Sequence, residues 1–277
     1  MSPTHDERLD ECWHDLAYAI VVQAANDYRE HYCNPKELDR FFRSEYYRTL
    51  TNVDGEMLIQ KLRKEWNRMK VTLIQATPKP VETIAKIASI CYGSDPKNPM
   101  GLVKHLYKNG HHSVFEHIYF TFKIEGISRA CSHQLVRHRH CSFTQRSQRY
   151  CHETGLDVVI PDSIGSQEES WNIYMTEMAK IADAYNKLTK REIPNEDARY
   201  LLANACETEL YLSCNLRELI HIANERLCTR AQWEIRACVR EMCNLVDPNL
   251  QFMLVPKCKS GRIICPSPCT DRKEENA

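Results

Sequence analysis

The chain has 277 residues, with 37 basic side chains (lysine and arginine) balanced by 37 acidic ones. This balance argues against a protein that coats nucleic acid non-specifically, because such binding needs an excess of positive charge. No apolar run approaches the length of a membrane span, and the polar, acidic segment 1–11 is unlike a signal peptide. We therefore expect a cytoplasmic protein whose 14 cysteines are mostly reduced, buried side chains.

Residues 1–68 are predicted to form a small, separate, all-helical appendage. The first helix is expected over 10–32, and its apolar face would carry Trp13, Leu16, Ile20, Val21 and Ala24. The Asn-Pro-Lys-Glu sequence at 34–37 is typical of a helix start and predicts a second helix to about Leu50. Asp54 is expected to open a third. A segment of this size is too small to be stable alone, so we expect it to pack on the rest of the chain.

From residue 69 onward, strands and long helices are mixed without regular alternation, which favours an α+β fold. Strands are predicted at 70–75, 119–125, 156–160 and 207–214, and helices at 81–91, 100–109, 129–137, 166–190, 216–226 and 230–246. Asn195 is expected to cap a further helix. The sequence has only 8 glycines and no glycine-rich phosphate loop, so it does not support a Rossmann or P-loop fold.

The run from Arg137 to Tyr150 has the composition of an anion site. It contains 4 arginines and 2 histidines together with several hydroxyl side chains. Arginine offers forked, permanently charged donors that suit phosphate, and serine and glutamine side chains can bind a polar ring. We predict a turn-rich stretch that binds a phosphorylated ligand. From composition alone, a nucleotide enzyme, a solvated basic loop and a nucleic-acid patch all remain open.

Two other clusters invite a metal hypothesis, and neither has a metal-binding pattern. The histidine-rich sequence 110–117 lacks the His-Glu-x-x-His spacing of a zinc protease, so a hydrogen-bonded loop is favoured. Cys258, Cys265 and Cys269 lack the paired Cys-x-x-Cys ends of a zinc knuckle. We therefore predict no metal site, and we interpret 251–277 as a plain tail that contains cysteine and proline.

Several elements together resemble the flavin-dependent thymidylate synthases. Arg-His-Arg at 137–139, seven further residues and then Ser147 match the RHR-x7-S signature of that family. The Gly-His-x-Ser-x-x-Glu-His sequence at 110–117 and the sequence 215–221 resemble two further elements of the family. The spacing is specific, because several residue types are fixed at once. The resemblance covers roughly 69–246 and leaves the N-terminal helices outside.

The resemblance implies a thymidylate synthase-complementing type fold over 69–250, with a central mixed or antiparallel sheet flanked by long helices. It implies reductive methylation of dUMP to dTMP, with methylenetetrahydrofolate as carbon donor and with FAD that is reduced by NADPH. It also implies a homotetramer whose active sites are shared between subunits. Neither a membrane nor a nucleic acid is expected as a partner.

The resemblance further implies roles for individual residues. Arg226 would be catalytic, because a fixed cation beside the uracil ring stabilises its ionised N3–O4 edge. FAD would be bound by Ser113, Arg137, His138, Arg139, Gln145, Asn215, Arg217 and His221. The dUMP-binding residues would be Gln134, Arg137, Gln145, Arg146, Ser147, Gln148, Arg149, Arg199 and Arg226. His111 would lie in the active site as a possible folate contact.

Two alternatives stay open at this point. A catalytically inactive, flavin-binding regulatory homologue would keep the fold and bind flavin without turnover. A nucleic-acid-binding module would use the same arginine- and histidine-rich run on phosphates. It would be colourless, and its binding would depend strongly on salt.

Overall fold

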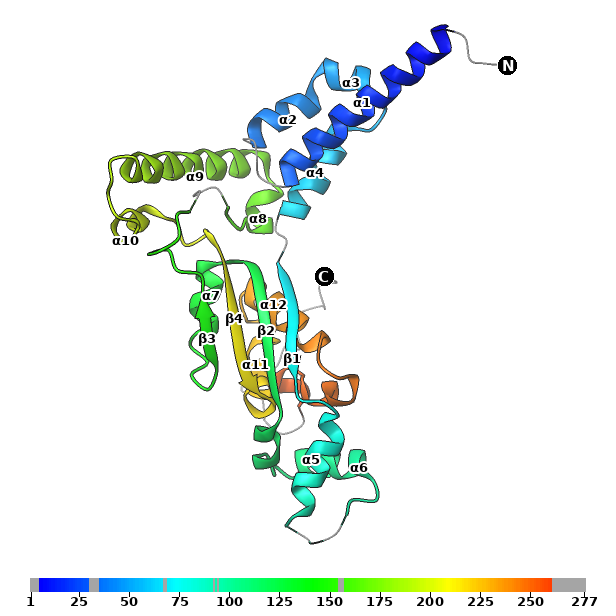
Figure 1. Ribbon diagram of the computed structural model, residues 1–277, viewed down its shortest axis with the longest axis vertical. Helices are drawn as coiled ribbons and strands as arrows, with labels where there is room; N and C mark the ends of the chain where they lie inside the picture. Colours follow the sequence, from blue (N-terminus) through cyan, green and yellow to red (C-terminus); the bar gives the residue numbers. More distant parts are fainter. Residues whose placement is uncertain are drawn as a thin grey trace. The chain divides into compact units, whose positions relative to one another are not determined.

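The computed structural model describes residues 5–29, 35–66, 69–91, 93, 95–153 and 157–260. The chain forms two compact units, each built from two separate stretches of sequence. Unit 1 combines Met1–Arg68 with Ser147–Glu207, and unit 2 combines Met69–Arg146 with Thr208–Ala277. Figure 1 shows the helices and strands of both units. Among the described residues, no helix is both long enough and apolar enough to cross a membrane.

Unit 1 begins with four helices: α1 (His5–Arg29), α2 (Pro35–Arg43), α3 (Glu45–Leu50) and α4 (Gly55–Trp66). The prediction of a single helix up to Leu50 is wrong, because Ser44 separates α2 from α3 and caps α3. Its hydroxyl accepts a hydrogen bond from the Tyr47 N–H at 3.1 Å. Asp54 opens α4 as predicted, and its Oδ1 accepts from the Met57 N–H at 2.7 Å.

The N-terminal helices share a core with the second stretch of unit 1. That stretch contains α8 (Asp162–Gly165), α9 (Glu168–Thr189), α10 (Asn195–Ala198) and η2 (Arg199–Leu201). Phe42, Tyr47 and Ile59 join Trp171 and Met175 of α9 in one buried cluster. The helical segment therefore packs on another part of the chain, as its small size requires.

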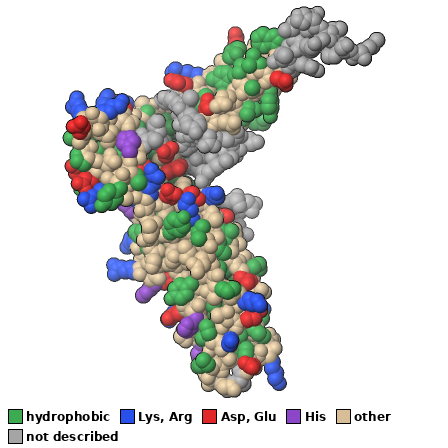
Figure 2. Space-filling model, in the orientation of Figure 1, with side chains coloured by type: hydrophobic (Ala, Val, Ile, Leu, Met, Phe, Trp, Pro, Cys, Tyr) green, Lys and Arg blue, Asp and Glu red, His purple; other side chains and the backbone are tan. Residues whose placement is uncertain are grey.

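Three details of unit 1 differ from the predictions. Trp13 and Leu16, expected on the apolar face of α1, are 65% and 51% exposed, and apolar side chains gather over the N-terminal helices in Figure 2. Asn195 is the first residue of α10 and not its cap, because Pro194 occupies the capping position. The strand predicted over 156–160 begins outside the described residues, and within them only Val158 forms a bridge, to Cys206.

Unit 2 is built on a sheet whose described strands lie in the order β1-β2-β4-β3. These strands are β1 (Lys70–Ala76), β2 (Tyr119–Ser128), β3 (Ser142–Gln145) and β4 (Glu207–Asn215). β1 is antiparallel to β2, and β3 is antiparallel to β4. The Leu216 N–H donates to the Ile118 carbonyl at 2.7 Å, and the Thr121 hydroxyl lies 2.9 Å from that of Ser213. Residue numbers thus run in opposite directions along β2 and β4, so the sheet is antiparallel and the α+β prediction is confirmed.

β3 lies within the run that was predicted to be turn-rich, and that prediction is wrong for Ser142–Gln145. Ser142 lies opposite Ser213 of β4, and Gln145 lies opposite Leu210. The strand has only 4 residues, and basic side chains flank it on both sides. Its pairing with β4 is a tertiary interaction that no local pattern contains.

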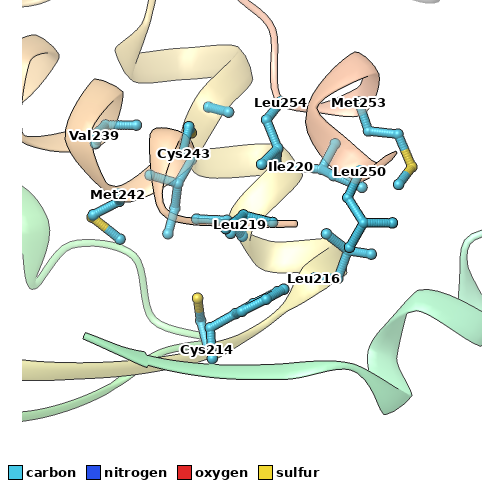
Figure 3. Packing of buried hydrophobic residues seen from close by; sticks show 14 of the residues in the cluster. Cys214, Leu216, Leu219, Ile220, Val239, Met242, Cys243, Leu250, Met253 and Leu254 are labelled. Atoms are coloured by element: carbon cyan, nitrogen blue, oxygen red, sulfur yellow. The ribbon is translucent and has the colours of Figure 1, made fainter. Parts of the chain in front are cut away.

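One face of the sheet packs on helices. Unit 2 contains α5 (Pro80–Ser89), α6 (Pro99–Lys108), α7 (Arg129–Leu135), α11 (Leu216–Arg226) and α12 (Trp233–Asn244), with short turns η1 (Ser113–His117), η3 (Pro248–Met253) and η4 (Lys257–Lys259). Phe122 and Leu212 of the strands share a core with Leu219 of α11 and Met242 of α12. Figure 3 shows the helical side of this core. Because the apolar side of α11 is packed in this core, its polar residues have a fixed orientation.

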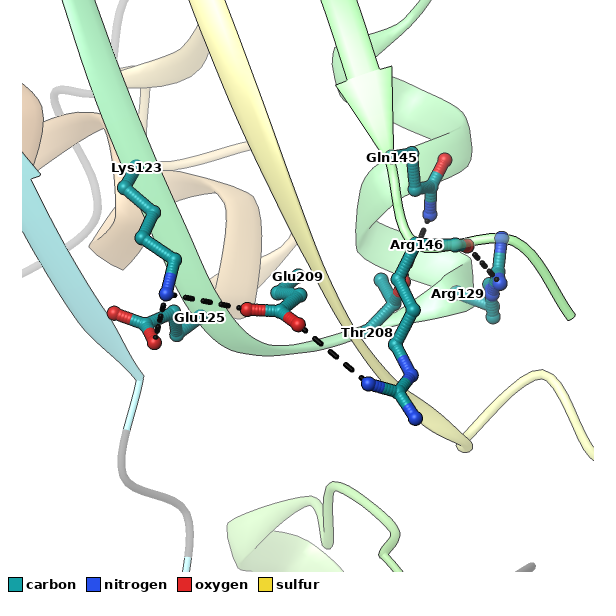
Figure 4. A network of polar contacts seen from close by, with 7 residues as sticks. All are labelled: Lys123, Glu125, Arg129, Gln145, Arg146, Thr208 and Glu209. Carbon is teal, nitrogen blue, oxygen red and sulfur yellow. Dashed lines mark hydrogen bonds and ion pairs between the residues drawn. The ribbon is translucent and has the colours of Figure 1, made fainter. Parts of the chain in front are cut away.

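Polar side chains at alternate positions of the strands form a network (Figure 4). Lys123 of β2 lies 2.7 Å from Glu125 and 3.3 Å from Glu209 of β4. Arg146, directly after β3, lies 3.6 Å from Glu209. Hydrogen bonds to Glu125 and Glu209 raise the pKa of Lys123. Each of these side chains therefore lies beside one of opposite charge.

Leu212→Ala is expected to lower the free energy of unfolding by about 2–5 kcal/mol, because it leaves a cavity at a fully buried position. Tyr211→Ala is the matched control, since Tyr211 is the preceding residue of β4, points to the other face and is 43% exposed. Urea unfolding of both variants tests the assigned faces of the sheet. A larger loss for Tyr211→Ala than for Leu212→Ala would contradict them.

Candidate active site

Three side chains form the centre of the site. Arg226, the last residue of α11, donates from Nε to Nε2 of His138 at 3.0 Å and from Nη2 to the Gln134 carbonyl at 3.5 Å. The other ring nitrogen of His138, Nδ1, lies 3.6 Å from Oε1 of Glu218 in the first turn of α11. His138 and Glu218 are both buried, and Arg226 is half-buried.

The hydrogen bond from Arg226 shows which ring nitrogen of His138 carries the proton. A guanidinium stays protonated in proteins, so Nε2 of His138 must be the acceptor. The proton of the neutral ring therefore lies on Nδ1, the nitrogen that faces Glu218. Burial and the positive charge of Arg226 lower the pKa of His138 to about 4. The ring is thus uncharged at neutral pH.

The local sequence explains why α11 presents these groups. Asn215 caps the helix, and its Oδ1 accepts from the Glu218 N–H at 2.9 Å. Leu216 and Leu219 are among the apolar residues that hold one side of α11 in the core. Glu218 lies near the positive end of the helix dipole and Arg226 at the negative end, so both charges have a favourable position.

A cleft of about 630 Å³ opens beside this centre. It is lined by His112, Glu116, His140, Asn215, Arg217, Glu218, Ile220, His221, Asn224, Glu225 and Ser260. Three of them, Asn215, Arg217 and His221, are predicted FAD-binding residues. Arg217 also forms an ion pair with Glu116 of η1, which brings the 110–117 element to the same cleft.

The histidines of the 110–117 element do not all reach the cleft. His111 and Ser113, both predicted site residues, are exposed and are not among its lining residues. His112 does line the cleft, and its ring stacks on that of Tyr107 with 5.9 Å between the centroids. His112 was missed from the sequence, because three histidines in one short loop give no indication of which one points inward.

Glu218 is a second site residue that was missed from the sequence. Its one signal there is its position three residues after the capping Asn215, where a glutamate usually reaches back to the start of the helix. His138, Glu218 and His221 bring possible metal-ligand atoms within 4.8 Å of one another. The permanent charge of Arg226 on His138 opposes a cation at this position.

The predicted dUMP-binding residues of unit 2 lie around α7 and β3. Gln145 Nε2 donates to the Ser132 hydroxyl at 2.9 Å and to the Thr208 hydroxyl at 3.2 Å. Arg146 faces Glu209 in the network of Figure 4. The structure thus gives Gln145 and Arg146 partners within the protein.

Arg137 and Arg139, the two arginines of the signature, are both exposed. They lie on either side of the buried His138 in the turn between α7 and β3. The three residues therefore divide into one ring that is held in the protein and two cations that face solvent, where an anionic ligand can reach them.

The remaining predicted dUMP-binding residues lie in unit 1, where two arginines meet at Glu196. Arg149 forms an ion pair with the Glu196 carboxylate, and its guanidinium lies 5.3 Å from the ring centroid of Tyr150. Arg199 donates from Nε to the Glu196 carbonyl at 3.1 Å. The Ser147 hydroxyl accepts from the Arg149 N–H at 3.2 Å. Unit 1 therefore holds a second group of predicted phosphate-binding side chains, and the neighbouring Gln148 is half-buried.

The protein has an α+β fold, a polar cleft beside α11 and clustered arginines in each unit. These are the features that an enzyme with phosphorylated ligands requires. The family model described as "Thymidylate synthase complementing protein" matches residues 72–250. A flavin-dependent thymidylate synthase of Geobacter sulfurreducens is 42% identical over 208 residues, which cover 70% of this chain and 90% of that protein. One of Clostridium tetani is 35% identical over 227 residues, covering 72% and 90%.

Solved structures show the same fold. Thymidylate synthase X of Helicobacter pylori, with FAD and dUMP, superposes with a TM-score of 0.57 at 22% identity and covers 69% of this chain and 99% of that one. A UMP/dUMP methylase of Streptomyces cacaoi, bound with 5-Br dUMP, has a TM-score of 0.60 at 20% identity, covering 68% and 94%. The chain belongs to the flavin-dependent thymidylate synthases, flavoprotein enzymes that make thymidylate, and the predicted family is confirmed.

The lowered pKa of His138 predicts a pH effect on stability. Between the unfolded value of 6.5 and the folded value of about 4, the unfolded chain binds a proton that the folded protein does not. The free energy of unfolding should therefore fall as the pH drops through this window. His138→Gln should remove that contribution, as measured by thermal unfolding across this pH window and above it.

The exposed histidine His105 of α6 provides the control for this measurement. His105→Gln should keep the pH dependence of the wild type. An unchanged pH dependence in His138→Gln would show that His138 does not carry the effect.

Proposed function

We propose that this enzyme converts dUMP to dTMP, with FAD as its cofactor, methylenetetrahydrofolate as carbon donor and NADPH as reductant. The observation that carries the proposal is Arg226: a half-buried guanidinium, fixed by His138 at 3.0 Å, at the end of the helix whose other residues line the cleft. When bound, FAD supplies the redox chemistry that side chains cannot perform.

The cleft suits part of a flavin nucleotide in size and in donors. Its volume of about 630 Å³ lies in the range of small-molecule sites. Asn215 uses Oδ1 to cap α11, so its amide nitrogen is the end that can donate to a ligand. Arg217 and His221 lie four residues apart on α11 and share a face. We assign the binding of FAD to these three residues, together with Ser113, Arg137, His138, Arg139 and Gln145.

Arg226 has the geometry to polarise a uracil ring. Its guanidinium has five N–H donors, and two of them are used by His138 and Gln134 among the contacts of the described residues. The remaining donors can face the N3–O4 edge of the pyrimidine. A fixed cation there lowers the free energy of the ionised ring, so that its carbon becomes a better nucleophile or hydride acceptor.

The arginines around Glu196 suit the phosphate of dUMP. Arg149 and Arg199 are each held by Glu196, which limits the conformational entropy that their side chains lose on binding an anion. Both remain exposed, so a phosphate can reach them. Ser147 and Gln148 of unit 1 are also proposed to bind dUMP. In unit 2 the same role is proposed for Gln134, Arg137, Gln145 and Arg146.

The proposal includes shared active sites in a homotetramer and a cytoplasmic location. The arginines and histidines of 137–226 exceed what one mononucleotide needs, which supports sites that hold several phosphorylated ligands. His111 is exposed beside the cleft-lining His112, a position that suits a folate contact. The described cysteines from Cys91 to Cys258 are free thiols, as a reducing compartment favours. Cys265 and Cys269 lie outside the described residues.

The test of the function is dTMP formation by the purified protein with FAD, NADPH, methylenetetrahydrofolate and dUMP, repeated with each component omitted in turn. Product that requires all four components is expected. A yellow, folded protein without product would support the inactive regulatory homologue instead. A colourless protein whose binding to nucleic acid depends strongly on salt would support the nucleic-acid module.

Arg226→Ala should leave FAD bound and lower the rate of dTMP formation by roughly 100- to 1000-fold, because it removes the cation from the ring. Flavin absorbance of the purified protein reports the bound cofactor. Arg236→Ala is the control, since it removes a guanidinium of α12 that donates to the Thr229 carbonyl at 3.0 Å. Loss of flavin from Arg226→Ala would instead assign Arg226 to cofactor binding.

Arg217→Ala should weaken FAD binding by roughly tenfold or more, because a hydrogen bond to a charged group contributes about 1.5–3 kcal/mol. Fluorescence titration of the apoprotein with FAD measures the effect. Arg240→Ala, which removes an exposed arginine of α12, is the control and should bind FAD like the wild type. Equal affinities of Arg217→Ala and the wild type would remove Arg217 from the cofactor site.

A further inference from the structure

We infer that Glu218 is a positioning residue for the reaction: its carboxylate holds His138 in the tautomer that accepts from Arg226, and thereby orients the Arg226 guanidinium. The inference rests on the proposed role of Arg226. Glu218 is not among the residues to which the family resemblance assigns a role.

The first observation is the burial of Glu218. Its side chain is 8% exposed, and a buried carboxylate is unfavourable unless polar groups compensate its charge. One compensation is the helix N-terminus, because Glu218 lies in the first turn of α11. The other is the Nδ1–H of His138, since Nδ1 lies 3.6 Å from Oε1. This distance is longer than a hydrogen bond, so the attraction between the two groups is electrostatic.

The second observation is the direction of that carboxylate. A glutamate three residues after a capping residue commonly reaches back to the N–H of the cap. Here the cap, Asn215, accepts from the Glu218 backbone, while Oε1 of Glu218 lies beside His138. A side chain that served only the helix end would not need this position.

The third observation is the geometry around His138. The ring is faced by Arg226 at Nε2, by Glu218 at Nδ1, and by His221, whose ring centroid lies 5.8 Å away. If the ring proton moved to Nε2, two N–H groups would face each other and Arg226 would turn away. Arg226 also contacts the Gln134 carbonyl, but at 3.5 Å this bond is too long to hold the guanidinium in place.

Glu218 thus acts on the orientation of Arg226 through His138. The carboxylate of Glu218 favours the proton on Nδ1, and the free Nε2 then accepts from Arg226. Glu218 and Arg226 lie at the two ends of α11. A substitution of Glu218 in the first turn is therefore expected to displace the Arg226 side chain at the last residue, through the contacts of His138 with both. A displacement of about 1 Å at a reacting group can lower a rate by about 100-fold.

The test is a double-mutant cycle on the full-length enzyme with FAD, using Glu218→Gln, Arg226→Lys and both together. Glutamine keeps the shape of the side chain but can place either an acceptor or a donor against Nδ1. Glu218→Gln should lower kcat, measured at saturating FAD, by roughly 10- to 100-fold, with the KM for dUMP within about threefold of the wild type. In the Arg226→Lys background it should lower kcat by less than about threefold, because lysine has no Nε–H for His138.

Glu234→Gln is the matched control for the loss of a buried carboxylate. Glu234 of α12 is also buried, and it accepts from the Ser128 N–H and hydroxyl, both at 2.6 Å. This variant should lower the melting temperature, and its effect on kcat should be equal in the wild-type and Arg226→Lys backgrounds. If Glu218→Gln does not fold or does not bind FAD, Glu218→Asp replaces it in the cycle under the same criteria.

Two results would overturn the inference. One is a kcat of Glu218→Gln within about threefold of the wild type, since a displaced guanidinium would lower the rate further. The other is an equal loss in both backgrounds, which would make Glu218 a structural residue independent of Arg226. The proposed function fails in a different way, since the wild-type enzyme would then form no dTMP at all.

Discussion

The hydrogen bond from Arg226 to His138 joins the two parts of the sequence that carry the chemistry. It spans 88 positions in the chain and connects the end of α11 to the loop between α7 and β3. The bond requires α11 to hold a fixed position on the sheet. The apolar residues of α11 provide that position by packing in the core beneath the sheet. Packing in the core and the geometry of the site are therefore linked, because a shift of α11 along the sheet would separate the two side chains.

An arginine bound to a histidine is unfavourable in water, and burial makes the pairing stable. In water the imidazole would take up protons near neutral pH, and a protonated ring would repel the guanidinium. In the protein the surrounding core and the charge of Arg226 lower the pKa of His138 to about 4, so the ring stays an acceptor. The pairing of a permanent donor with a neutral acceptor keeps Arg226 oriented over the whole neutral pH range.

Elements that form through contacts between neighbouring residues were predictable from the sequence, whereas elements that depend on a single cap or on distant contacts were not. β1, β2, β4 and α11 were predictable, because their apolar residues recur at a regular period within one element. The break at Ser44 depends on a single hydroxyl that caps a new helix, and a continuous apolar pattern hides it. β3 is too short for a periodic signal and forms because β4 offers it an edge.

The candidate site was predictable in part and for a different reason. Arg217 and His221 share a face of one helix, so their convergence follows from helical geometry. The ion pair between Glu116 and Arg217 joins positions 101 residues apart, and the contact of Glu218 with His138 joins α11 to the loop after α7. Contacts between residues so far apart in the sequence depend on the order of the strands in the sheet, and the sequence pattern alone does not specify that order.

The fixed spacing of the RHR-x7-S signature has a structural explanation in this fold. The seven residues between Arg139 and Ser147 include all of β3, whose last residue, Gln145, is held by Ser132 and Thr208. Successive residues of a strand point to opposite faces, so one residue more or less before β3 would turn Gln145 away from both partners. It would also disturb the pairing of β3 with β4, the strand that leads directly into α11. The spacing of the signature therefore fixes the register of β3 against β4. Because α11 begins where β4 ends, the same register also relates the signature to the helix that carries Arg226.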